Sequence, residues 1–256
     1  MPESTALLLR IDRFGMNRRY PYVMLASVDN EAVVLAVLAD RYGLPMDRLV
    51  PGEIAVAEVR HPSLPVRAFT REGGAVLAVA PQYAELLRRL LDGPANVLTS
   101  LERVAVELRG HVFSGVARTG VAIPPPMVAV TVLDATDPRL PDWVIGHFTG
   151  EAWVVLDDDG SVLSTAVLKR YDDRLREISV GTAERARGRG LARSVVAAAA
   201  RHVLSEDRAV LYNHAPDNYA SAKVAESVGL HEFGRYHAIV PDRRIGIEYG
   251  KDDASR

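Results

Sequence analysis

Residues 180–192 read Val180-Gly181-Thr182-Ala183-Glu184-Arg185-Ala186-Arg187-Gly188-Arg189-Gly190-Leu191-Ala192. This stretch begins at the end of a predicted strand, passes through a short loop rich in glycine and arginine, and ends in the first turn of an alanine-rich helix. Glycine lets a backbone approach a ligand closely, and the N-terminus of a helix carries partial positive charge. This combination predicts a loop that binds a phosphate or a pyrophosphate.

Two common phosphate-binding patterns do not fit this loop. No Gly-Lys-Ser/Thr follows the glycines, as a P-loop requires, and Arg193 stands where the third glycine of a dinucleotide-binding fingerprint belongs. An arm that binds nucleic acid would need aromatic side chains for stacking, and the loop has none. An arginine-rich helix start that lies in solvent stays open on this stretch alone.

The flanking residues predict a mixed sheet in the second half of the chain. Strands are expected at 129–133, 152–156, 162–169, 174–182 and 209–213, helices at 141–148, 191–204 and 219–228, and a closing hairpin at 232–240 and 243–249. The turn Asp157-Asp158-Asp159-Gly160 is explained by hairpin geometry, because no further metal ligand lies at a recognised spacing. The fold class is therefore α/β, with several antiparallel strands in a mixed sheet flanked by helices.

A proline run divides the chain into two nearly equal parts. Ile123-Pro124-Pro125-Pro126-Met127 favours an extended backbone that continues neither a helix nor a central strand. We therefore expect one domain at residues 1–124 and a second at 125–256. The first part predicts a smaller α/β domain with helices at 31–42, 82–91 and 101–108, capped by Asn30, Gly43 and Ser100, and with strands at 53–59, 66–70 and 75–80.

Composition excludes several classes of protein. The 256 residues contain no cysteine, which rules out disulfides, thiolate metal sites and a cysteine nucleophile. The formal net charge of −2 gives no overall attraction to nucleic acid or to a membrane surface. His61 and His111 have no partners at metal-ligand spacing. We expect a cytoplasmic protein with no metal and with neither a membrane nor a nucleic acid as partner.

Two motifs together resemble a known family. Arg185-x-x-Gly188-x-Gly190 is similar to the acyl-CoA pyrophosphate loop of the GNAT superfamily of N-acetyltransferases. Further along, Asn218, Ser221 and Val224, followed by Gly229-Leu230, resemble the second signature of that family. The similarity covers roughly residues 128–250. It implies a GNAT-like, mostly antiparallel sheet with a V-shaped opening between the strand that ends at Thr182 and the strand 209–213.

The resemblance also implies how acetyl-CoA, or another short acyl-CoA, would be held. The backbones of two strand residues would bond the pantetheine arm, amides of the loop would hold the pyrophosphate, and the arginines would reach the 3′-phosphate. Asn218 would bond the pantetheine beside the helix that carries Ser221. The implied binding residues are Val180, Thr182, Arg185, Arg187, Gly188, Arg189, Gly190, Leu191, Ala192, Asn218 and Ser221.

The family chemistry is direct attack of an amine on the thioester. It requires a base, donors for the oxyanion and an acid for the thiolate. The resemblance implies Glu177 as the base and the Val180 amide as a donor. Many members have a tyrosine acid where this chain has Ala225, so Ser221 is the nearest substitute. The alternatives left open are His214 and Asp217 as bases or members of a water chain, and Tyr236 and His237 as acceptor-facing residues.

These motifs lead to one expected function and one alternative. We expect an N-acetyltransferase that transfers the acetyl group of acetyl-CoA to a primary amine of a small molecule or a peptide. The alternative is a CoA-binding sensor or regulatory protein without turnover. Three roles stay open for residues 1–124: a degenerate second copy of the same fold, a dimerisation surface that makes a homodimer, or an acceptor-selecting domain. Trp143 and Phe148 are expected in the core rather than in contact with the acceptor.

Overall fold

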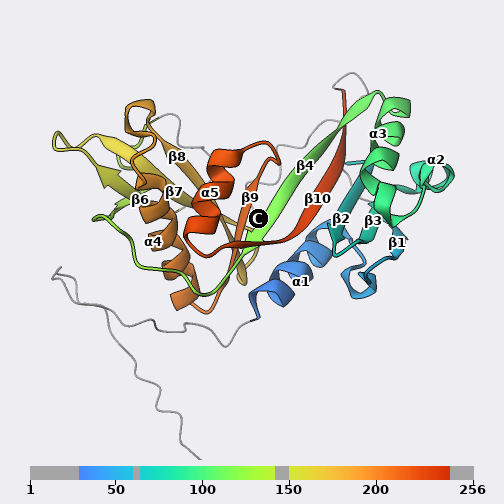
Figure 1. The fold of residues 1–256 in the computed structure, drawn as a ribbon, viewed down its shortest axis with the longest axis horizontal. Helices are drawn as coiled ribbons and strands as arrows, with labels where there is room; N and C mark the ends of the chain where they lie inside the picture. The colour runs from blue at the N-terminus through green and yellow to red at the C-terminus, as the bar shows by residue number, and fades with distance from the viewer. Residues whose placement is uncertain (1–28, 60–63, 142–149, 243–256) are drawn as a thin grey trace, which may run out of the picture.

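One twisted sheet runs through the whole molecule. The computed structural model describes residues 29–59, 64–141 and 150–242, and within them the strands form a single ten-stranded sheet in the order β1-β3-β2-β10-β4-β9-β8-β7-β6-β5 (Figure 1). All neighbours are antiparallel except the pairs β1–β3 and β8–β9. The strands are β1 (Ile54–Glu58), β2 (Val66–Arg71), β3 (Gly74–Val79), β4 (Gly110–Thr119), β5 (Thr131–Asp134), β6 (Glu151–Leu156), β7 (Val162–Arg170), β8 (Leu175–Thr182), β9 (Ala209–His214) and β10 (His231–Pro241).

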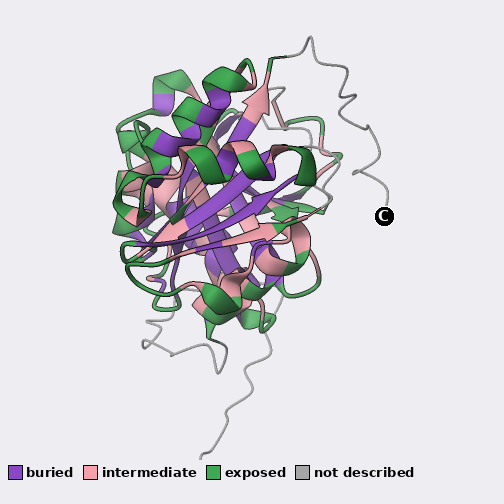
Figure 2. Ribbon diagram, turned by 90° about the vertical axis from the view of Figure 1, so that its right-hand side faces the viewer, coloured by how far each residue is buried: buried purple, intermediate pink, exposed green. Residues whose placement is uncertain are grey.

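Five α-helices cover this sheet, with buried strands between them (Figure 2). Helix α1 packs on one face, where its Val34 and Leu38 share a core with Phe69 of β2 and Leu211 of β9. Tyr212 follows Leu211 and points to the opposite face, because successive strand residues alternate. That face is covered by α2 and α3 at one end and by α4 and α5 at the other. The helices are α1 (Asn30–Tyr42), α2 (Ala84–Leu90), α3 (Val97–Glu107), α4 (Leu191–Ser205) and α5 (Tyr219–Ser227).

The two halves of the chain exchange their last strands. Strand β4, the last of the first half, lies between β9 and β10 of the second half. Strand β10 in turn lies between β2 and β4, and it pairs with β4 along almost its whole length, from His231 opposite Thr119 to Pro241 opposite Gly110 (Figure 1). The predicted boundary at residue 124 stays a prediction, but the sheet is continuous across it.

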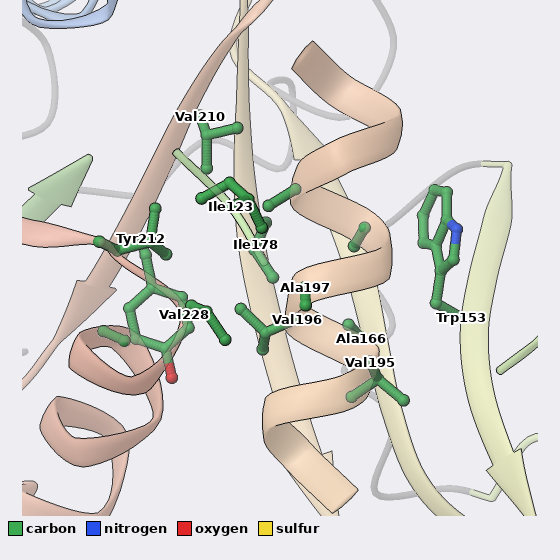
Figure 3. Packing of buried hydrophobic residues seen from close by; sticks show 14 of the residues in the cluster. Ile123, Trp153, Ala166, Ile178, Val195, Val196, Ala197, Val210, Tyr212 and Val228 are labelled. Atoms are coloured by element: carbon green, nitrogen blue, oxygen red, sulfur yellow. The ribbon is translucent and has the colours of Figure 1, made fainter. Parts of the chain in front are cut away.

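Helix α4 is the main cover of the second half. Its Val195, Val196 and Ala197 are almost fully buried against Ile178 of β8 and Val210 of β9 (Figure 3). Burying each valine stabilises the fold by about 1.5–3 kcal/mol relative to exposure. The proline segment lies along the same helix, where Arg201 Nη1 donates to the carbonyl of Ile123 at 2.9 Å. This packing fixes the start of α4, and with it the loop that precedes the helix.

The predicted fold class is confirmed, with corrections in detail. Helix α1 is capped by Asp29, whose side chain accepts from the Ala32 amide, rather than by Asn30. Asn30 is instead buried and donates to the Gly120 carbonyl at 3.0 Å. Helix α3 begins at Val97, so the expected cap, Ser100, lies inside it, where its hydroxyl accepts from the Asp92 amide. The expected helix at 141–148 and the second strand of the closing hairpin at 243–249 lie outside the described residues, apart from residue 141.

The sequence analysis missed β4, although this strand lies at the centre of the sheet. Glycine disfavours strand interiors, and β4 contains Gly110 and Gly115. Its outer half alternates between exposed and half-buried residues, while its inner half from Gly115 to Thr119 is buried on both faces. A buried run of this kind lacks the alternation by which a strand is recognised.

Stability is expected to fall below neutral pH because of His237. This histidine on β10 is buried, its Nδ1 lies 2.8 Å from the Ser114 hydroxyl, and its Nε2 lies 3.4 Å from the Thr70 hydroxyl. Burial, followed by the charge of Arg235, lowers the pKa of His237 from 6.5 to about 4. The unfolded chain therefore binds a proton more readily, so the free energy of unfolding should drop by up to about 3 kcal/mol as the pH falls from 6.5 to 4.

Denaturant unfolding at several pH values tests this expectation. The His237→Gln variant should lose less stability between pH 6.5 and 4 than the unmodified protein does. The matched control is His111→Gln on β4, since the His111 side chain is 64% exposed. An identical pH dependence in the His237 variant and the unmodified protein would contradict the assignment.

Candidate active site

The strands β8 and β9 separate beside the loop singled out in the sequence. They pair in parallel only from Leu175 opposite Ala209 to Glu177 opposite Leu211, and beyond this point β9 pairs with β4 instead. The Ala209 amide donates to the Arg174 carbonyl, while the Ala183 amide donates across to β7. Peptide groups alternate along a strand, so those of residues 178, 180 and 182 face the open side toward β9. Val180 and Thr182 thus lie where an extended ligand could pair with them.

The loop after β8 holds two glycines in a conformation that other residues rarely adopt. Gly188 has φ +77° and Gly190 has φ +75°, and a Cβ at either position would meet nothing within 4 Å. Gly190 is the N-cap of α4, so no side chain caps this helix, and its first turn contains no acidic residue. The amides around Leu191 and Ala192 therefore carry the partial positive charge of the helix into open space. Arg187 and Arg189 are exposed beside them.

Arg185, the first residue of the loop motif, has a different environment. Its guanidinium pairs with Asp157 and donates to the Ser161 hydroxyl at 2.5 Å, both in the turn between β6 and β7. This interaction holds the pKa of the Asp157 carboxyl below its usual range. Arg185 thus contacts the neighbouring turn, and its predicted role in cofactor binding stays a prediction. Two aspartates of that turn accept hydrogen bonds through their carboxylates: Asp157 from Arg185 and the Asp158 amide, and Asp159 from the Ser161 amide.

The second motif lies on and before α5. Asn218 caps this helix, and its Oδ1 accepts from the Ser221 amide at 3.0 Å. The Ser221 side chain lies near the buried hydroxyl of Tyr212. Burial raises the pKa of Tyr212, and the interaction with Ser221 partly opposes that rise. Figure 3 shows the Tyr212 ring beside Val228 in the core under α5.

Glu177 lies at the point where β8 and β9 separate. It shares a face of the sheet with Leu211 and Asn213, and it lines a cavity of about 390 Å³ under α1. The Tyr171 side chain lines the same cavity, close to Glu177 and to Tyr42. Burial, followed by the nearby charge of Glu177, raises the pKa of Tyr171, so this phenol stays neutral and can donate.

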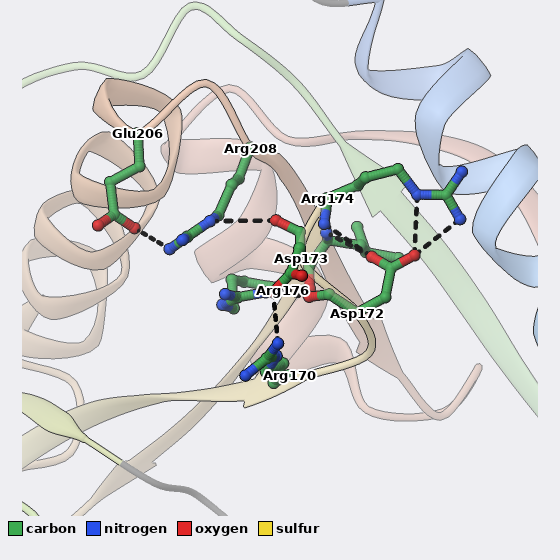
Figure 4. A network of polar contacts seen from close by, with 8 residues as sticks. Arg170, Asp172, Asp173, Arg174, Arg176, Glu206 and Arg208 are labelled. Atoms are coloured by element: carbon green, nitrogen blue, oxygen red, sulfur yellow. Dashed lines mark hydrogen bonds and ion pairs between the residues drawn. The ribbon is translucent and has the colours of Figure 1, made fainter. Parts of the chain in front are cut away.

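The turn that carries Tyr171 is braced by a charged network (Figure 4). The Asp172 carboxylate accepts from the Arg174 amide at 2.8 Å and from its side chain at 2.8 Å. Arg174 also pairs with Asp40 of α1 at 2.7 Å. On the far side of the turn, Arg208 donates to the Asp173 carbonyl at 3.1 Å. These contacts fix Tyr171 against Tyr42, the last residue of α1.

Tyr42 and Tyr171 were missed as site residues in the sequence analysis. Tyr171 could have been found from the β7–β8 hairpin, because pairing of Lys169 with Glu177 places Tyr171 diagonally across from Glu177. Nothing local signals Tyr42, which reaches the site only through the packing of α1. Tyr236 and His237 both belong to the lining of the same cavity, and the His237 ring nitrogens lie beside the hydroxyls of Ser114 and Thr70.

His214 has no free basic nitrogen. Arg118 Nε donates to its Nε2 at 2.9 Å, and its Nδ1 lies 2.8 Å from the Ala215 carbonyl. Because arginine only donates, Nε2 must accept and Nδ1 must carry the proton. Both ring nitrogens of His214 are therefore occupied, which argues against a role as base. Asp217 is exposed in the loop after β9, and nothing places it in the cavity.

The described residues contain no group of three or more histidine or acidic side chains that could hold a metal ion. Among the same residues, no helix is both long enough and apolar enough to cross a membrane.

The site thus combines an uncapped helix start, the open edge of β8 and, further back on the same strand, a carboxylate in a cavity. Residues 128–231 match the model of the acetyltransferase (GNAT) domain family. Over these residues the chain is therefore similar to the GNAT acetyltransferases, a family that indicates acetyl transfer dependent on acyl-CoA. The comparison with curated proteins found no match.

Solved structures with a similar fold include several GNAT proteins. A GCN5-related N-acetyltransferase-like protein from Streptococcus suis is 18% identical, with 83% of this chain and 98% of that chain covered and a TM-score of 0.46. A tandem GNAT protein from the clavulanic acid biosynthesis pathway is 14% identical, with 84% and 97% covered and a TM-score of 0.42. For a GNAT-family protein from Novosphingobium aromaticivorans the identity is 18%, the coverage 52% and 66%, and the TM-score 0.43.

Proposed function

We propose that this protein transfers the acetyl group of acetyl-CoA to a primary amine by direct attack. The observation that carries the proposal is the position of Glu177, at the point where β8 and β9 separate and inside the cavity. A donor laid along the open edge of β8 would bring its thioester to this point, and an amine in the cavity would meet it there. We also propose that the transferred group is acetyl rather than a longer acyl chain, and that the protein is cytoplasmic.

The residues present fit acetyl-CoA, which supplies an activated acyl group as a thioester. The peptide groups of Val180 and Thr182 are unpaired on the side toward β9 and would pair with the pantetheine. The amides at the start of α4, together with Gly188 and Gly190, would hold the pyrophosphate, because they are uncapped and the space around them is open. Asn218 keeps its Nδ2 group for the pantetheine, since only its Oδ1 caps α5.

The cavity offers hydrogen-bond acceptors to an amine. The Glu177 carboxylate is one, and Asn213 Oδ1 is a second, being buried without a hydrogen-bond partner among the described residues. Glu177 would take one proton of the ammonium, and the neutral nitrogen would then bond to the carbonyl carbon. As the carbon–sulfur bond breaks, the nitrogen would lose a second proton to solvent, which leaves a neutral amide. The Val180 amide would donate to the carbonyl oxygen as charge develops on it. Ser221, near the Tyr212 hydroxyl, would supply a proton to the departing thiolate.

The glycine loop provides a direct test of donor binding. Gly190→Asp places a negative charge at the start of α4, so the affinity for CoA should fall by roughly 10- to 100-fold, a range that follows from repulsion of one charge near the pyrophosphate. Isothermal calorimetry with CoA measures this change. Gly190→Asn has nearly the same size and tolerates the left-handed conformation about as well, so it should lose much less affinity.

A second control separates strain from charge. Gly52 also has a positive φ, +77°, and open space around its Cβ position, but it lies in the first half of the chain. Gly52→Asp should therefore leave the affinity for CoA unchanged. Equal affinities in Gly190→Asp and the unmodified protein would contradict the proposed donor site.

One observation keeps the sensor alternative in view. Ala225, at the position where many family members have tyrosine, is completely buried in the core under α4 and α5. A thiol-release assay with acetyl-CoA and a panel of amines separates the two functions. Tight binding of CoA without release across the panel would favour the sensor.

The cavity also suggests a role for the first half of the chain. Within the proposed division into residues 1–124 and 125–256, the first part supplies Tyr42 from α1, Phe69 from β2 and Phe113 from β4 to the cavity that contains Glu177. Of the three roles considered, this placement supports the acceptor-selecting one.

A further inference from the structure

The floor of the Glu177 cavity is made of aromatic rings that lie flat on the sheet. Tyr236 on β10 lies across Gly115 on β4, where a Cβ would come within 2.1 Å of the ring. Phe69 on β2 lies in the same way across Gly234, where a Cβ would come within 2.2 Å of the ring. Each ring therefore extends over the next strand in the direction of β9: Phe69 over β10, and Tyr236 over β4. The two glycines are what allow the rings to lie flat.

The mouth of the cavity carries a further exposed ring. Phe113 on β4 lines the cavity and is 49% exposed, and its ring centroid lies 5.9 Å from that of Tyr236. Leu38 and Leu44 line the cavity as well, from α1 and the segment that follows it. A large apolar side chain left open at the entrance to a mostly apolar cavity is typical of a surface that a ligand covers.

The polar groups gather mainly at the other end. Lys169, Glu177 and Asn213 come from β7, β8 and β9 in that order. The aromatic floor comes from β4, β10 and β2, where Arg67 and His237 are the other polar strand residues of the lining. Two cations lie over tyrosine rings at the walls: Lys169 Nζ is 5.4 Å from the centre of Tyr171, and Arg67 is 4.5 Å from that of Tyr42. Nearby positive charge favours the neutral form of an amine, which is the form that attacks.

These features describe the shape of the acceptor. We infer that the acceptor is a primary amine joined by a short chain to an aromatic ring, with the nitrogen at Glu177 and Asn213 and the ring against Tyr236 and Phe113. The inference rests on the proposed function and adds the substrate class to it. A cavity of about 390 Å³ is far larger than a simple alkylamine needs, while a flat floor matches a planar ring.

Matched acceptors test the inference on the full chain. Thiol release with acetyl-CoA is measured for 2-phenylethylamine, ethylamine and 1,4-diaminobutane, and binding of CoA alone is measured by calorimetry. The value of kcat/KM should be roughly 10- to 100-fold higher for 2-phenylethylamine than for ethylamine, because the phenyl ring is buried in the cavity. The diamine should react no better than ethylamine, since its second cation would meet the apolar floor.

Two variants locate the preference in the cavity. Phe113→Ala should reduce the preference for 2-phenylethylamine over ethylamine several-fold, with binding of CoA unchanged. Leu98→Ala is the matched control, because Leu98 is 44% exposed on α3 and does not line this cavity. Gly115→Ala should displace the Tyr236 ring and reduce the same preference, and Phe113→Ala keeps the test decisive if that variant does not fold.

The outcomes that overturn the inference differ from those that overturn the function. If CoA binds and thiol is released equally fast with 2-phenylethylamine and ethylamine, the aromatic class is wrong while acetyl transfer stands. A preference that persists unchanged in Phe113→Ala would place the ring elsewhere and overturn the assignment. If CoA does not bind at all, both the inference and the proposed function fail.

Discussion

Replacing Glu177 by glutamine is expected to slow acetyl transfer by about 100- to 10,000-fold, the usual contribution of a general base. Glutamine keeps the size of the side chain and its contact with Tyr171 but cannot accept the proton of the ammonium. Binding of CoA should be unchanged, because the residue lies beyond the unpaired edge of β8 where the donor is proposed to bind. Steady-state thiol release at saturating acetyl-CoA gives the comparison.

The pH profile distinguishes a lost base from a disturbed cavity. Without Glu177, the amine must lose its proton to water, so the rate of the variant should keep rising with pH toward the pKa of the free amine. Asp217→Asn is the matched control, since this exposed carboxylate lies just past the end of β9 and is the other acidic candidate. A large loss in Asp217→Asn together with a small loss in Glu177→Gln would exchange their roles.

Separating the chain at residue 124 is expected to abolish folding of both pieces. Without β10, the first piece leaves β2 and β4 with no strand between them, and without β4, the second piece leaves β9 and β10 apart. The fully buried Ile239 of β10 packs in the core under α2 and α3, so its loss opens that core as well. Neither piece should show a cooperative unfolding transition by circular dichroism.

Expression of the two pieces together should restore the folded structure. The two pieces, expressed together, should assemble into a one-to-one complex that binds CoA, because all strand pairings can then form. A protease site placed between residues 124 and 125 and cleaved after folding should leave the same complex intact on size-exclusion chromatography. A second piece that alone unfolds cooperatively and binds CoA would contradict this expectation.

Much of the second half could be predicted because its signals are local. The alternation in 152–156 and 162–169, the turn between them and the glycine loop before α4 each depend on neighbouring residues, and each element lies within one or two residues of its expected place. The loop motif also identified the uncapped helix start. Local propensity and tertiary packing agree in these segments, which is why the sequence alone suffices.

The cavity depended on pairings that span the chain. Tyr236 is placed by Gly115, which lies more than 100 residues earlier, and Tyr42 meets Tyr171 through the packing of α1, which the pair of Asp40 and Arg174 supports. The order of strands β2, β10, β4 and β9 alternates between the two halves, and no local pattern encodes such an exchange. Arg185 shows that a motif does not reveal every contact of its residues. Its pairing with Asp157, in the turn between β6 and β7, could not be predicted from the motif.

Strand β4 lies between a strand of the proposed donor site and a strand of the proposed acceptor site. On one side it is hydrogen-bonded to β9, which borders the proposed donor opening, and on the other to β10, which carries the ring under the acceptor. A change in the twist of β9 when the donor enters must therefore pass through a single strand to reach Tyr236. Because β4 contacts both sites, we expect the two binding steps to be energetically coupled. Each substrate should then change the affinity for the other by the same factor.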